Sequence, residues 1–251
     1  MKQLYAIAKF TLKENISNRI FNGILFFGML VIFTTVVLKE ISLYDSAKVI
    51  REVGTALIEF FILMMTVYIS STLIIKHKNE KSIYLVLTKP VSKSTYVTGI
   101  NLGIMATVLI NVIMMGVVLF FVLLWQKGET GSAYFYTMMF IFYKLAIITS
   151  LGVFFSIVSD SIVTANIFTF SMYIIAHAVL EIKMLADKVE NPLYKYLLEG
   201  LYYILPNMRV LNFKDYLKSM EPNILKITIY VIGYIAVTIA LSNIIFSKKK
   251  I

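Results

Sequence analysis

The chain has 251 residues, of which 59% are hydrophobic, with no cysteine and a formal net charge of +10. Soluble domains are roughly 45–50% apolar, and here the excess is gathered in runs long enough to cross a bilayer, which needs about 20 residues. The composition therefore indicates an all-α integral membrane protein and excludes a disulfide framework or thiolate metal sites. The positive charge fits lysines that hold loops in the cytosol, so we expect no nucleic-acid partner.

The first 18 residues are too polar to span a membrane. On a helix, Lys2, Lys9 and Lys13 fall within a sector of about 40°. The apolar side chains to one side of that sector are Met1, Leu4, Tyr5, Ala8 and Leu12. This pattern predicts that residues 1–18 form an interfacial helix on the cytosolic leaflet.

Six apolar runs follow, and each is long enough for a transmembrane helix. Together they predict one transmembrane domain over residues 1–251, which lies in the lipid bilayer as a multi-pass protein of the plasma (inner) membrane. The predicted spans are about 20–38, 54–75, 99–125, 134–158, 162–180 and 223–246.

The orientation depends on where the cations lie, because lysine and arginine are almost equally numerous on the two sides. The cations of segments 1–19, 76–98 and 247–251 lie in short stretches directly beside the spans, which is where the positive-inside rule acts. We therefore expect both termini to be cytosolic, in agreement with an even number of spans.

The segment 76–98 is a lysine-rich interruption between two apolar runs, with Glu80 as its one acid. Proline disfavours helix at the residue before it, so we expect a short helix from about Asn79 to Leu87, a break at Pro90, and a new helix with Ser92 or Ser94 as N-cap. The short helix would expose Ile83, Tyr84 and Leu87. Exposed apolar side chains of that kind mark a surface that binds a partner.

The stretch 181–222 is the longest segment outside the predicted spans. Asn191-Pro192 reads as an N-cap and first helical residue, and Leu193, Tyr194, Leu197, Leu198 and Leu201 then recur at helical spacing. Pro206-Asn207 ends that helix, and a second short helix is expected from Asn212 to Met220. We therefore predict short external helices before the last span.

Glu59 and Lys144 are the only charges well inside the predicted spans, where a charge costs about 2.5–3.5 kcal/mol even on insertion scales. Both positions count to the outer half of the bilayer. We favour a structural ion pair. The alternatives are a polar transport path through Glu59 and an unpaired, neutral Glu59.

No catalytic or metal-binding motif occurs in the sequence. It contains no G-x-x-x-x-G-K-[ST], H-E-x-x-H or G-x-S-x-G. His77 and His177 fall on opposite sides of the membrane in the predicted topology and cannot share a metal. His177 is expected to be satisfied locally, with Glu181 one turn later, and the methionine pairs are expected to fill apolar space. We therefore expect that the chain is not an enzyme and holds no metal or cofactor.

Two stretches resemble the permeases of ABC type-2 exporters. Residues 80–93, EKSIYLVLTKPVSK, are similar to the family's segment after span two. Residues 205–213, LPNMRVLNF, with Pro206, Asn207 and Phe213, are similar to an external motif of the branch called multi-copper enzyme maturation permeases. Lys93 stands where that family commonly has arginine.

The resemblance implies a membrane subunit that pairs with a second permease subunit, as a homo- or heterodimer, and docks a separate cytosolic ABC ATPase, which would carry ATP and Mg²⁺. The docking residues that it implies are Lys9, Lys13, Glu80, Ile83, Tyr84 and Leu87. An ATP-independent membrane transporter or assembly factor is the alternative. Nothing in the sequence selects a substrate.

Overall fold

The computed structural model describes most of the chain, and all structural statements below concern that part. The described residues are 2–18, 22–23, 25–26, 28–30, 32, 46–82, 91–126, 131–189, 191–212 and 223–249. More than half of the predicted first span 20–38, most of the predicted helix 79–87 and nearly all of the predicted helix 212–220 lie outside them.

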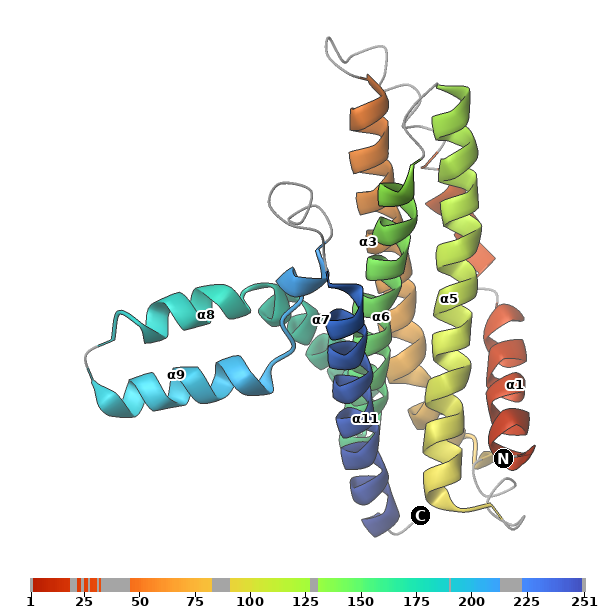
Figure 1. Cartoon of the computed structure of the whole chain (residues 1–251). Helices are drawn as coiled ribbons and strands as arrows, with labels where there is room; N and C mark the ends of the chain where they lie inside the picture. The colour runs from red at the N-terminus through yellow and green to blue at the C-terminus, as the bar shows by residue number, and fades with distance from the viewer. Residues whose placement is uncertain are drawn as a thin grey trace.

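The described elements are helical. Long helices alternate in direction through the molecule, and the start of α1 and the end of α11 lie at the same end of the bundle (Figure 1). The elements are α1 (Lys2–Ile16), α3 (Ser46–Asn79), α5 (Lys93–Trp125), α6 (Ser132–Val158), α7 (Ile162–His177), α8 (Val179–Ala186), α9 (Pro192–Ile204), the 3₁₀ helix η1 (Arg209–Leu211) and α11 (Ile224–Lys248).

Four of the described helices, α3, α5, α6 and α11, are long and apolar enough to cross a membrane. A fifth span is possible if α7 and α8, which meet at an angle of 57°, are counted as one. These helices coincide with five of the six predicted spans. The fifth prediction, 162–180, needs a correction, because the helix bends after His177 instead of continuing straight.

Helix α6 occupies the middle of the bundle, in contact with α3, α5, α7 and α11. Its face toward these neighbours carries Leu145, Ile147 and Val153, all fully buried. Small residues such as Gly152 and Ser150 lie on the same helix and allow close backbone approach, which is how helices pack where lipid removes the hydrophobic driving force.

Helix α1 packs along the first half of α5. Its buried residues are Thr11 and Asn15, and Asn15 Nδ2 donates to Thr107 Oγ1 over 3.1 Å. Gly103 makes the contact possible, because an added Cβ would lie 2.7 Å from the Ala8 carbonyl oxygen. The inward face of α1 is therefore partly polar, whereas Tyr5, from the predicted apolar side, is exposed.

Several predicted helix boundaries are present in the structure. Ser92 is the N-cap of α5, with its hydroxyl accepting from Thr95 N–H at 3.1 Å. Asn191 is the N-cap of α9: its Oδ1 accepts from Leu193 N–H at 3.0 Å, and Pro192 is the first helical residue. Helix α9 ends before Pro206. The predicted helix start at Asn79 is wrong, because α3 continues to that residue and the chain then turns through Lys81 at φ 57°.

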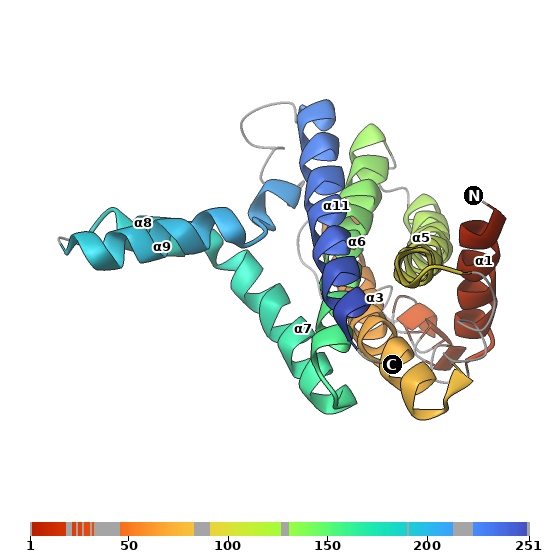
Figure 2. The ribbon, with the colours of Figure 1, turned by 90° about the horizontal axis from the view of Figure 1, so that it is seen from below.

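Helices α8 and α9 form a hairpin that projects sideways from the bundle (Figures 1 and 2). No residue of α9 is buried. The exposed apolar side chains of α9 are Leu193, Tyr194, Tyr196, Leu197, Leu201, Tyr203 and Ile204. The hairpin thus keeps an uncovered apolar surface on α9.

Candidate functional site

Glu59 and Lys144 lie in direct contact, on α3 and α6. Lys144 Nζ donates to Glu59 Oε1 at 2.8 Å and to Oε2 at 3.0 Å. The Lys144 side chain is 4% exposed and that of Glu59 is 19% exposed, so the pair is largely removed from solvent. Because breaking a buried pair leaves an uncompensated charge, these two side chains hold α3 and α6 together.

Two further side chains complete what we call the Glu59 cluster, defined as Glu59, Lys144, Tyr173 and Asn212. Tyr173 of α7 donates its hydroxyl to Glu59 Oε1 at 2.8 Å. Lys144 also donates to Asn212 Oδ1 at 3.4 Å. The cluster therefore joins α3, α6, α7 and the chain just after η1.

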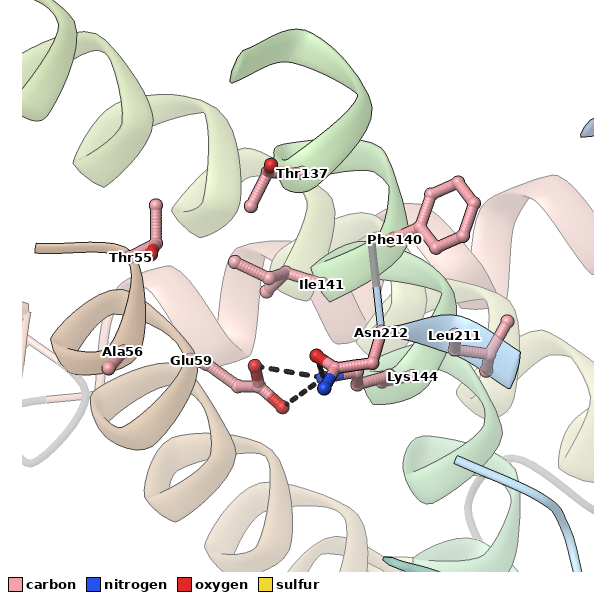
Figure 3. Close-up of a pocket in the computed structure, with 9 residues that line it drawn as sticks. All are labelled: Thr55, Ala56, Glu59, Thr137, Phe140, Ile141, Lys144, Leu211 and Asn212. Carbon is pink, nitrogen blue, oxygen red and sulfur yellow. Dashed lines mark hydrogen bonds and ion pairs between the residues drawn. The ribbon is translucent and has the colours of Figure 1, made fainter. Parts of the chain in front are cut away.

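A cavity of about 160 Å³ opens beside the pair (Figure 3). Its lining includes Thr55, Thr137 and Phe140 as well as Glu59 and Lys144. At about 30 Å³ for each water, this volume suits a few waters or a small polar group. Glu59 is more exposed than Lys144, so the carboxylate is the charged group that the cavity reaches more easily.

Both threonine hydroxyls in the walls of this cavity present acceptors. The hydroxyl of Thr55 donates to the Glu52 carbonyl and that of Thr137 to the Ala133 carbonyl, so their oxygens face other partners only as acceptors. Three contacts engage the Lys144 ammonium. The threonine oxygens and the Glu59 carboxylate therefore offer acceptors to a donor group, while the Asn212 amide nitrogen is a donor in the same lining.

Residues 205–212, from the motif LPNMRVLNF, form a strap over this region, here called the 205–212 strap. Met208 and Leu211 are fully buried, and Met208 N–H donates to the Ala176 carbonyl at 3.1 Å. Asn207 N–H donates to Tyr230 Oη at 2.8 Å. The strap thus packs against α7 and α11 and delivers Asn212 to Lys144. Phe213 lies outside the described residues.

His177 lies at the bend between α7 and α8. Its Nδ1 donates to the Tyr173 carbonyl at 2.9 Å, and its ring centroid is 4.4 Å from that of Tyr173. Glu181, the expected neighbour one turn later, instead pairs with Arg209 of η1. The histidine is satisfied locally, while the glutamate fastens the 205–212 strap to α8.

A second polar cluster lies near the end of the bundle where α1 begins and α11 ends. His77 of α3 contacts Tyr96 Oη through Nδ1 at 2.8 Å and Glu14 Oε2 through Nε2 at 3.1 Å. Lys76 Nζ donates to Glu14 Oε1 at 3.2 Å. The hydrogen bond from His77, with the nearby Lys76, lowers the pKa of Glu14 although burial opposes this shift.

The segment 80–92 is flanked by further contacts at this end. Lys78 pairs with Asp160 of the α6–α7 turn at 2.8 Å, and this bond lowers the pKa of Asp160. Lys93 Nζ donates to the Lys249 carbonyl at 2.9 Å, where free carbonyls at the end of α11 favour a cation. Contacts to α1, α11 and the α6–α7 turn therefore surround the base of the segment.

The residues implied by the resemblance are only partly described. Lys9 and Lys13 are exposed on α1, and Glu80 is exposed in the turn after α3. Ile83, Tyr84 and Leu87 lie outside the described residues. Sequence reasoning missed Glu14, Tyr96, Tyr173 and Asn212, because the side chains that they meet in the two clusters lie on other elements, between 19 and 114 residues away in the sequence.

The long apolar helices indicate a multi-pass membrane protein. Residues 5–251 match the family described as ABC-2 family transporter protein. The chain therefore belongs to the ABC-2 transporter family and is a membrane permease component of an ABC transporter. A comparison with curated proteins finds no match to the chain.

Proposed function

We propose that this chain is the membrane-spanning permease subunit of an ATP-driven exporter, which docks a separate cytosolic ATPase, pairs with a second permease subunit and forms the translocation path. The observation that carries the proposal is the family match over residues 5–251, nearly the whole chain. The sequence has no P-loop motif, so a partner would supply ATP hydrolysis.

The arrangement of the helices supports a cytosolic position for both termini. The start of α1, the end of α11 and both flanks of segment 80–92 lie at one end of the bundle (Figure 1). That end gathers the cations Lys2, Lys76, Lys78, Lys93 and Lys249, as the positive-inside rule requires of a cytosolic face. We propose that this face lies in the cytosol at the plasma membrane.

The docking surface that we propose combines α1, through Lys9 and Lys13, with Glu80, Ile83, Tyr84 and Leu87. Affinity purification of the tagged chain from its native membranes should recover a P-loop ATPase, identified by mass spectrometry. The combined variant Tyr84→Asp and Leu87→Asp should lose the ATPase but stay inserted. Tyr203→Asp, on the hairpin at a distance from this surface, is the matched control and should retain it.

The topology part of the proposal has an independent test, because the chain contains no cysteine. Asn79→Cys should react with a membrane-impermeant maleimide in inside-out vesicles and not in intact cells. Labelling from outside the cell would contradict the orientation.

An ATP-independent transporter or assembly factor is the alternative function. The Glu59 carboxylate beside the 160 Å³ cavity is the feature that favours it, because intramembrane acids mark ion paths in carriers. Recovery of the chain without any ATPase, together with transport that Glu59→Gln abolishes, would select this alternative.

A further inference from the structure

Glu14, His77 and Tyr96 come from three helices and meet in one chain of hydrogen bonds, which we call the Glu14 clamp. His77 is 8% exposed and Tyr96 is 1% exposed. Tyr96 also stacks on Phe246 of α11, with ring centroids 6.0 Å apart and planes at 21°. The clamp therefore draws α1, α3, α5 and α11 together near the base of segment 80–92.

The hydrogen-bond roles follow from the chemistry of the three groups. The Glu14 carboxylate can only accept, so Nε2 of His77 must carry the hydrogen that faces it. In a neutral imidazole Nδ1 is then an acceptor, and the Tyr96 hydroxyl must donate to it. The neutral ring thus uses one donor and one acceptor, and each has a partner.

The position of the clamp matters because it joins two segments that are distant in sequence. Glu14 follows the exposed Lys9 and Lys13 on α1, and His77 lies three residues before Glu80. Both segments belong to the docking surface proposed above. The hydrogen bond between His77 and Glu14 fixes the end of α1 relative to the residues that lead into segment 80–92.

We infer that Glu14 and His77 are positioning residues that lock α1 to the base of segment 80–92, with Tyr96 as the second anchor of the histidine. This inference rests on the proposed function for its purpose, but the clamp itself is measurable on the chain alone. A failure to find an ATPase would therefore not be confused with a failure of the clamp.

The test measures the distance between two spin labels, at Lys2→Cys and Glu80→Cys, on the full chain in lipid nanodiscs at about pH 8. The wild-type background should give one narrow distribution. His77→Phe keeps a ring but removes both hydrogen bonds and should at least double the width. His77→Gln retains one donor and one acceptor and should restore a narrow distribution.

The comparison of His77→Phe with His77→Gln separates positioning by hydrogen bonds from simple packing of a ring. A His77→Phe distribution as narrow as that of the wild type would overturn the inference. A His77→Gln distribution as broad as that of His77→Phe would also overturn it, because the hydrogen bonds would then not be what holds the segment.

Two controls keep the result specific. Lys78→Ala removes the exposed pair with Asp160 and should leave the distribution narrow. If Lys78→Ala broadened the distance distribution as much as His77→Phe does, the surface ion pair and not the clamp would hold the segment. A second label pair, at Trp125→Cys and Leu225→Cys, lies away from the clamp, and broadening of this pair by His77→Phe would reveal a general folding defect and refute a positioning role.

Discussion

Ser70 of α3 packs directly against Gly152 of α6, so closely that a Cβ atom on Gly152 would lie 2.7 Å from the Cβ of Ser70. Ser70 is fully buried, and its hydroxyl donates to the Thr66 carbonyl of its own helix at 2.7 Å. Thr169 Cγ2 of α7 would lie 3.3 Å from the same added Cβ, so the contact is tight on that side as well. The crossing of α3 and α6 therefore depends on a missing side chain.

We predict that Gly152→Ala destabilises the protein by about 1–3 kcal/mol, since overpacking forces the two helices apart. Gly233→Ala on α11 is the matched control, because nothing lies within 4 Å of its added Cβ. Alanine is about 1 kcal/mol better than glycine inside a helix, so this control should be neutral or stabilising. Thermal unfolding in detergent measures both, and adding Ser70→Gly to Gly152→Ala should recover part of the loss.

The pair of Glu59 and Lys144 should show strong energetic coupling. Glu59→Gln or Lys144→Met alone leaves one buried partner without its counterion and should cost on the order of 3–5 kcal/mol. The double variant removes both charges and should lose clearly less than the sum of the two single variants. A double-mutant cycle on thermal stability checks this, and a coupling energy near zero would assign Glu59 to another role, such as a polar path.

Stability should fall at acid pH through Glu14. The pKa of Glu14 is lowered from its ordinary value of 4.5, so its contribution is fully present above about pH 4.5 and is lost as the pH falls through the lower pKa of the folded protein. Glu14→Gln should therefore lower the melting temperature at pH 7 and flatten its decline toward about pH 3. Glu80→Gln, in an exposed turn, is the control and should keep the wild-type acid profile.

The α8–α9 hairpin should lie in the membrane interface with the stripe of Leu193, Leu197, Leu201 and Ile204 toward lipid, as amphipathic helices do. Trp125 is the only tryptophan, so Trp125→Phe gives a dark background. In this background, brominated lipid should quench the fluorescence of Leu197→Trp at least twice as strongly as that of Lys195→Trp. Lys195 lies on the opposite face of α9. Equal quenching would place the stripe against something other than lipid.

Local sequence signals predicted much of the fold. The apolar runs locate α3, α5, α6, α7 and α11, because a bilayer requires long apolar helices whatever their neighbours are. Ser92, Asn191 with Pro192, and the break at Pro206 were predicted because capping and proline effects act within a few residues. The contact of Glu59 with Lys144 was expected from the cost of an isolated charge in the membrane.

Only the tertiary structure decided which distant polar residues meet. Tyr173 and Asn212 reach the Glu59–Lys144 pair, and His77 bridges Glu14 and Tyr96, through helix packing that brings together residues between 19 and 114 positions apart. The sequence by itself determined where helices form and that the chain belongs in a membrane, since these depend on local composition. Which polar residues become partners depends on how the helices cross. The crossings are set by close contacts such as that of Ser70 with Gly152, which leave no periodic pattern in the sequence.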